Sequence, residues 1–121
     1  MDAPRANTFP RRIRIVRTRE YDRVFATRKS AADANLVVYA RPNDLTFARM
    51  GVIAGKKVGR AVTRNRVKRL VREAFRTSRE DLRDGFDYVV VVRKGASKAR
   101  FADIRTALVE VAGRAGAKWE K

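Results

Sequence analysis

The run from Tyr88 to Val92 constrains the fold of this chain more than any other segment. It consists of one tyrosine followed by four valines, and no polar residue interrupts it. A half-buried strand alternates apolar and polar residues, whereas a strand that is buried on both faces does not. The run therefore predicts a central strand of a sheet.

Three other segments show the spacing of amphipathic helices. The first is predicted to begin with Thr18 as its N-cap and Glu20 in its first turn. We expect the last of the three to fray near Gly113 and Gly116. The apolar faces of the three predicted helices consist of Tyr21, Val24 and Phe25, then Val67, Leu70, Val71, Ala74 and Phe75, and finally Phe101, Ile104, Leu108 and Val111.

Two further strands are predicted between the first two helices. Residues 35–41 are rich in β-branched and aromatic side chains, Pro42, Asn43 and Asp44 have the composition of a turn, and residues 45–54 can return as a second strand. This pattern predicts a β-hairpin. The order of elements is a helix, a hairpin or three short strands, a long helix, a strand and a last helix. It predicts an α+β sandwich in which helices pack on a small sheet, and it leaves the order of the strands open.

The length of 121 residues predicts one domain with one modest core. Residues 1–17 combine prolines with five arginines, which indicates a basic and mobile N-terminal arm. We expect the domain itself to span residues 18–115 and a short C-terminal tail to span residues 116–121.

The charge of the chain points to a polyanionic partner. The sequence has 30 Lys and Arg against 13 Asp and Glu, a net charge of +17, which opposes compact folding unless a polyanion screens it. Anionic lipid also attracts basic clusters, but no apolar run approaches the roughly 20 residues of a membrane-spanning helix. The first ten residues contain no apolar stretch typical of a secretory signal. We therefore expect a cytoplasmic protein that binds nucleic acid and no membrane.

The side-chain chemistry of the chain argues against an active site. The sequence contains neither cysteine nor histidine, which excludes disulfides, thiolate nucleophiles and the most common general base and metal ligand. The acidic residues are scattered rather than grouped in a recognisable motif. We expect no catalytic residue, no metal site and no cofactor bound by the protein alone.

Residues 56–76 carry nine basic residues and a single acid, Glu73. A solvated helix face usually mixes both signs of charge, so a face of one sign favours a polyanionic ligand. Arginine suits phosphate because its guanidinium donates two parallel hydrogen bonds, while the amide of Asn65 can both donate and accept. We expect Arg64 and Arg66 to lie at the surface. These features indicate a nucleic-acid binder and do not choose between RNA and DNA.

The segment from Gly55 to Arg76 closely resembles the signature of bacterial ribonuclease P proteins, K-K-x-G-x-A-x-x-R-N-R-x-K-R-x-x-R-E, with its spacing intact. The resemblance extends over roughly residues 12–114. It implies a two-layer α-β-β-β-α-β-α sandwich with a four-stranded sheet and a left-handed crossover. It also implies contacts with the RNA subunit near its catalytic core. The residues at the matching positions are Lys56, Lys57, Arg60, Arg64, Asn65, Arg66, Lys68, Arg69, Arg72 and Arg76.

The same resemblance implies a function that needs no protein active site. In ribonuclease P the RNA subunit, with bound Mg²⁺, removes the 5′ leader of precursor tRNA by endonucleolytic cleavage. The partners implied for this chain are the ribonuclease P RNA and precursor tRNA, with no obligate protein partner.

The resemblance further implies a cleft between the first helix and the sheet that binds the single-stranded leader. Tyr21, Phe25, Val37 and Tyr39 fall on the positions that line it. Aromatic rings stack on unpaired bases for roughly 1–3 kcal/mol each. Spacing alone favours core packing for these side chains, so the cleft depends on the resemblance. The chain has Tyr21 where the family commonly has Phe, and residues 53–57 lack the hydroxyls of the family's Ser-x-Ser-Lys-Lys run.

Two other functions stay open at this point. A generic ribosomal-type RNA-binding protein would share the size and charge but would lack the combination of a basic helix with an aromatic cleft. A protein nuclease would need grouped carboxylates or a general base, and the sequence offers neither in recognisable form.

Overall fold

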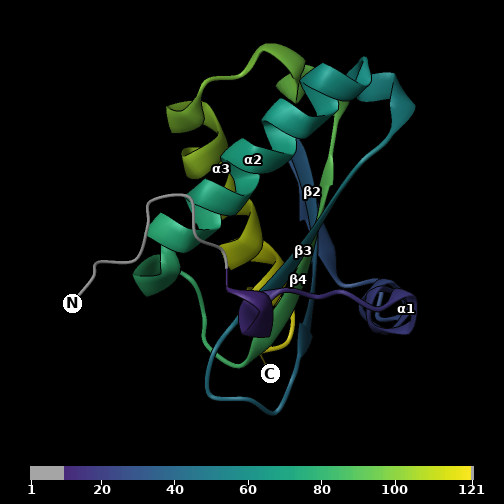
Figure 1. Ribbon diagram of the computed structural model, residues 1–121. Coiled ribbons are helices and arrows are strands. Elements are labelled where there is room, and N and C mark those ends of the chain that lie inside the picture. Colours follow the sequence, from purple (N-terminus) through teal and green to yellow (C-terminus); the bar gives the residue numbers. More distant parts are fainter. Residues whose placement is uncertain (1–9, 121) are drawn as a thin grey trace, which may run out of the picture.

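Three helices and one four-stranded sheet make up the computed structural model, which describes residues 10–120 (Figure 1). The order of these elements is α-β-β-β-α-β-α, as the resemblance implied, so this prediction is confirmed. In chain order the elements are α1 (Thr18–Ala26), β1 (Ser30–Ala32), β2 (Leu36–Pro42), β3 (Arg49–Ala54), α2 (Ala61–Thr77), β4 (Phe86–Val92) and α3 (Phe101–Ala117).

Strand β4 lies inside the sheet, whose strand order is β1-β2-β4-β3. It runs antiparallel to β2 and parallel to β3, so Val90 has Val38 as its partner on one side and Val52 on the other. The prediction of a central strand over residues 88–92 is thus confirmed. The crossover that joins the parallel strands β3 and β4 is made by α2.

The predicted hairpin between residues 35–41 and 45–54 is wrong, because β4 lies between β2 and β3. The valine-rich strand needs a partner on each edge, and it takes β2 and β3 as these partners. The hairpin that does form joins β1 to β2. Its turn is closed by the Asp33 carboxylate, which accepts hydrogen bonds from the backbone N–H groups of Asn35 and Leu36, both at 2.8 Å.

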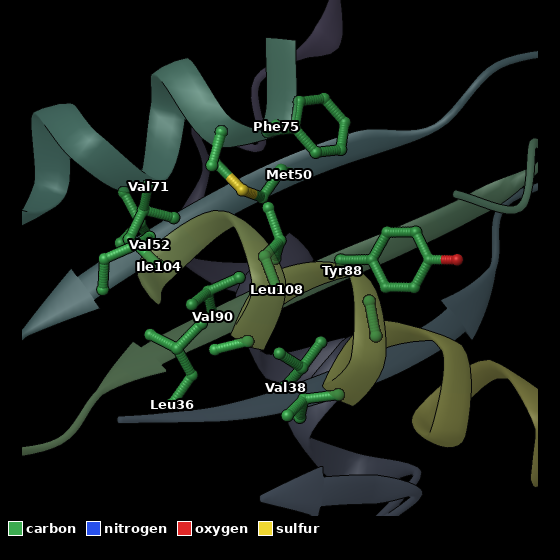
Figure 2. Close-up of a cluster of buried hydrophobic side chains, with 14 of the residues drawn as sticks. Leu36, Val38, Met50, Val52, Val71, Phe75, Tyr88, Val90, Ile104 and Leu108 are labelled. Carbon is green, nitrogen blue, oxygen red and sulfur yellow. The ribbon is translucent and has the colours of Figure 1, made fainter. Parts of the chain in front are cut away.

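Helices α2 and α3 pack on one face of the sheet and form the main core (Figure 2). The predicted inner faces of both helices are confirmed, because all their members are buried except the half-buried Leu70 and Phe101. Each large apolar side chain buried in this way contributes roughly 1.5–3 kcal/mol. The side chains that meet between the helices and the sheet include Val38, Val90, Val71, Phe75, Ile104 and Leu108.

Helix α1 packs on the opposite face of the sheet, against β2 and β4 (Figure 1). Val24 of α1 is buried together with Ile15 and Val89, and the three form a second, smaller apolar cluster. Because α1 has only nine residues, it covers only part of this face. Further along the same face of the sheet, Val91 of β4 is half-buried and Ile53 of β3 is exposed. The sheet therefore has one fully covered face and one partly open face.

The N-terminal boundary of the domain differs from the prediction. Residues 1–9 of the predicted arm lie outside the described residues, but residues 10–17 pack on the domain. Ile13 and Ile15 are buried, and the Ile15 N–H donates a hydrogen bond to the Met50 carbonyl at 3.0 Å. This segment covers part of the outer edge of β3. Helix α1 begins at Thr18 itself, with Arg17 as its N-cap.

The C-terminal boundary differs as well, because α3 continues through Gly113 and Gly116 instead of fraying there. Gly116 is buried against Arg83, and a Cβ at this position would lie 2.8 Å from the Arg83 Cδ atom. The predicted tail is also fixed to the sheet, since the Trp119 indole N–H donates to the Ala40 carbonyl at 2.9 Å. Close packing thus holds the helix where glycine propensity alone would end it.

The buried ring of Tyr88 should make the fold sensitive to alkali. Burial raises the pKa of the Tyr88 phenol to about 12, above its ordinary value of 10.0. The unfolded chain loses this proton at lower pH than the folded chain. The contribution of Tyr88 to the free energy of unfolding is therefore complete below about pH 10 and falls as the pH rises toward 12, by about 2–3 kcal/mol in all.

We expect Tyr88→Phe to remove this part of the alkaline sensitivity while keeping the ring in place. Urea denaturation at about pH 9 and about pH 11 measures it. The unchanged protein should lose more stability between the two pH values than the variant does, and equal losses would contradict the assignment.

Candidate nucleic-acid interface

The ten predicted RNA-contacting residues lie on one continuous segment, the short 3-10 turn at Lys56–Val58 and the helix α2 that follows it. We call these ten residues the basic face. Five of them, Lys56, Lys57, Arg60, Asn65 and Arg69, are exposed. The other five, Arg64, Arg66, Lys68, Arg72 and Arg76, are half-buried. All ten residues thus lie on one turn and the helix that follows it, and their contact with RNA stays a prediction.

The start of α2 is set by local backbone chemistry. Val58 is buried, and Gly59 follows it with a φ of 147°, a backbone conformation that residues with a Cβ atom rarely adopt. The Arg60 carbonyl then accepts the first helical hydrogen bond from the Arg64 N–H at 2.9 Å. No acidic residue stands in the first turn, so the positive end of the helix dipole adds to the charge of Lys56 and Lys57.

Two arginines of the basic face are engaged within the protein. Arg66 was expected at the surface, but its guanidinium donates to the carbonyls of Ser97 at 2.6 Å and Ala99 at 3.3 Å. Arg76 forms an ion pair with Glu73 at 2.5 Å on the same helix. The prediction that the Arg66 side chain lies at the surface is therefore wrong, because its guanidinium binds carbonyl oxygens of the loop before α3.

The residues of the predicted cleft converge on the partly open face of the sheet. The rings of Phe25 and Tyr39 meet edge to face, with their centroids 4.9 Å apart. Tyr21 belongs to the same apolar cluster. Val37 lies on the same face of β2, two residues from Tyr39, and is half-buried. We call these four residues the aromatic cleft, after the predicted leader-binding cleft that they would line.

Tyr21 lies directly over the backbone of Gly51, which leaves space for the ring because it has no side chain. Burial raises the pKa of the Tyr21 phenol, an effect that the nearby charge of Arg72 and a hydrogen bond from the Val52 N–H oppose. Tyr21, Arg72 and Arg14 line one small pocket of about 40 Å³. The aromatic cleft and the basic face therefore meet at Tyr21 and Arg72.

A wider hollow of about 380 Å³ lies between the end of β4 and the 3-10 turn at Lys56–Val58. Val58, Val91 and Val92 provide its apolar lining, and Lys56, Arg93 and Lys94 are among the cations around it. Sequence reasoning missed Arg93 and Lys94, which follow the central strand and carry no motif. The open face thus combines an apolar surface with a basic rim.

An ion-pair network below α1 was also missed. Arg49 binds the buried Asp87 carboxylate through two hydrogen bonds of 2.9 and 2.7 Å and reaches Glu20 of α1 at 3.3 Å. The Asn43 amide donates to the same Asp87 carboxylate at 2.9 Å. A signal was present in the sequence, because an aspartate at the start of a buried strand requires a partner.

The described residues offer no cage for a metal ion. In residues 10–120, no group of three or more Asp, Glu, His or Cys side chains lies in an arrangement that could hold one.

Comparison with known proteins finds the same family along most of the chain. A family model described as Ribonuclease P matches residues 9–116. A ribonuclease P protein component from Chromobacterium violaceum is 44% identical over 104 residues, which are 85% of each chain. Another, from Geobacillus kaustophilus, is 34% identical over 108 residues, which are 88% of each chain.

Solved structures agree with this result. The RNase P protein from Thermotoga maritima has a TM-score of 0.76 and 33% identity, covering 84% of this chain and 96% of its own. The Staphylococcus aureus RNase P protein has a TM-score of 0.73 and 30% identity, covering 82% of this chain and 91% of its own. Both sequence and fold thus place the chain among these proteins.

We expect Arg66→Ala to destabilise the fold, because it leaves two backbone carbonyls without their charged donor. The free energy of unfolding should fall by about 1–3 kcal/mol in urea denaturation. Arg69→Ala is the matched control, since it removes the same charge from an exposed position of the same helix. Equally small losses in both variants would show that the Arg66 contacts do not support the fold.

Proposed function

Since the chain belongs to the ribonuclease P protein family, we propose that its basic face binds the ribonuclease P RNA and its aromatic cleft binds the 5′ leader of precursor tRNA. Membership of this family makes the chain the RNA-binding protein subunit of ribonuclease P, which takes part in maturing the 5′ end of transfer RNA. The proposal concerns which surface of the chain serves which RNA.

The observation that carries the proposal is the meeting of the basic face and the aromatic cleft at Tyr21 and Arg72. A single strand of RNA presents phosphates on one side and unstacked bases on the other, so it needs cations beside an aromatic or apolar platform. The aromatic cleft and the hollow beside Val91 supply the platform, while the basic face, Arg93 and Lys94 supply the cations.

The basic face also contains an unsatisfied donor. The Nε atom of Arg64 is buried without a hydrogen-bond partner among the described residues. Such groups are rare in folded proteins and cost free energy unless a ligand or a rearrangement satisfies them. This supports Arg64 as a residue whose surroundings are completed by bound RNA.

In this proposal the RNA subunit performs the cleavage with Mg²⁺, and the chain contributes binding. The protein brings cations to two polyanions that would otherwise repel each other, and it holds the leader beside the catalytic RNA. The proposal assigns the Mg²⁺ ions to the RNA-containing holoenzyme.

The proposed place of action is the cytoplasm, together with precursor tRNA. No helix in residues 10–120 has the length and apolar character needed to cross a membrane. The proposed partners are the RNA subunit and precursor tRNA, without an obligate protein partner.

Cleavage of a precursor tRNA by a bacterial ribonuclease P RNA at low Mg²⁺ tests this function. We expect the protein to restore correct 5′ processing and to be inert without the RNA, because its cations replace part of the screening that Mg²⁺ provides. If the protein bound RNA tightly without any stimulation, the generic ribosomal-type function would be favoured instead.

Gly51→Ala tests the leader-binding role of the aromatic cleft. The new Cβ would overlap the Tyr21 hydroxyl oxygen and would lie 2.6 Å from the ring, so the Tyr21 ring must shift. The holoenzyme should bind leader-bearing precursor about five- to tenfold more weakly, with binding of leaderless tRNA unchanged. Gly113→Ala is the matched control, because no atom lies within 4 Å of its Cβ position and it belongs to α3, which contributes to neither the aromatic cleft nor the basic face. Equal behaviour of the two variants would count against the cleft.

A further inference from the structure

Helix α1 carries Tyr21 and Phe25, yet apolar contacts hold it only weakly. It spans nine residues, fewer than the roughly 12–15 that an isolated helix needs to be stable in water. Val24 is the one fully buried residue that α1 contributes in the described structure. The positions of Tyr21 and Phe25 over the sheet therefore depend on other contacts between α1 and its surroundings.

Polar contacts fix the helix at both ends. After the last turn, the Thr27 hydroxyl lies 2.8 Å from the Val24 carbonyl of α1 and 3.4 Å from the Ala40 carbonyl of β2. In the first turn, the Glu20 carboxylate accepts a hydrogen bond from Arg49 of β3 at 3.3 Å. The Glu20 carboxylate thus joins the end that carries Tyr21 to the sheet through Arg49, and its other oxygen accepts a hydrogen bond from the Arg17 N–H at 3.4 Å.

Arg49 is itself held rigidly. Its Nε and one terminal nitrogen bind the two oxygens of Asp87, the residue directly opposite it on β4. The Asp87 side chain is only 5% exposed, and Asn43 donates to it as well. With two of its nitrogens fixed in this way, Arg49 presents its remaining terminal nitrogen to Glu20. The planar guanidinium suits this double task because three separate nitrogens share the contacts, whereas lysine has a single nitrogen.

We propose that Arg49 is a positioning residue for leader binding: fixed by Asp87, it holds Glu20 and thereby places α1 so that Tyr21 and Phe25 form the aromatic cleft. This inference rests on the proposed function of that cleft. Arg49 and Asp87 lie two residues before Gly51 and Val89 on the same strands, so they belong to the same face of the sheet. The network therefore lies next to the part of the sheet that Tyr21 covers. Arg49 acts through α1 and does not line the cleft.

Glu20→Ala is the first test, because it releases α1 while leaving the pair of Arg49 and Asp87 intact. In the holoenzyme, the dissociation constant for leader-bearing precursor tRNA should rise about three- to tenfold, and that for leaderless tRNA should not change. Asp22→Ala is the matched control, since Asp22 is an exposed acid of the same helix. Both variants raise the net charge by one, so a loss confined to Glu20→Ala cannot come from charge.

Arg49→Lys is the second variant. Lysine can neutralise Asp87, which protects the fold, but it cannot also hold Glu20. The same leader-specific loss is expected, and thermal unfolding checks that each variant is folded. Hydrogen exchange of the α1 amides should quicken in both variants while exchange in β4 stays unchanged.

Phe25→Ala, measured in the same assay, separates the failure of this inference from that of the proposed function. If Phe25→Ala weakens leader binding while Glu20→Ala and Arg49→Lys match the Asp22→Ala control, the positioning role is overturned and the cleft stands. If Glu20→Ala weakens binding of leader-bearing and leaderless tRNA alike, the role is merely structural and the inference fails. If Phe25→Ala has no effect on leader binding, the cleft fails and the inference fails with it.

Discussion

The four consecutive valines of β4 can be buried only if apolar side chains cover the strand from both sides and other strands pair with both of its edges. Strands β2 and β3 provide the pairing, and helices α2 and α3 bury one face completely. The other face receives only α1 and the segment around Ile15. The central strand thus determines the layers, and the shortage of covering elements on one side determines where the sheet stays open.

The two faces of α2 show how a small and highly charged chain divides its tasks. The inner side buries Val67, Val71, Ala74 and Phe75 in the core, where transfer from water stabilises the fold. The outer side carries cations that repel each other and so destabilise the helix, and contact with a polyanion relieves this repulsion. Arg66 shows that this division is not complete, because its guanidinium serves the fold by holding the loop before α3.

Local patterns predicted much of this structure, since they report on burial over a few residues. The valine run, the helix faces and the one-sign charge of residues 56–76 are of this kind. Strand order was not predicted, because turn residues between residues 41 and 45 look the same whether or not the neighbouring strands pair. The network of Glu20, Arg49 and Asp87 joins three distant segments, so no local pattern contains it. The burial of Ile13 and Ile15 was missed because cations surround them in the sequence.

The insertion of β4 between two earlier strands has a consequence for synthesis on the ribosome. When β2 and β3 leave the ribosome, the strand edges that later pair with β4 are unpaired. The two strands do not pair with each other in the native sheet, because β4 lies between them. Helix α2 also lacks its sheet until residue 92 is available. The chain therefore completes its core only after β4 and α3 are available, through contacts between residues distant in the sequence. A nascent chain that stops before β4 contains α1 and α2 but lacks α3 and the central strand that these helices cover.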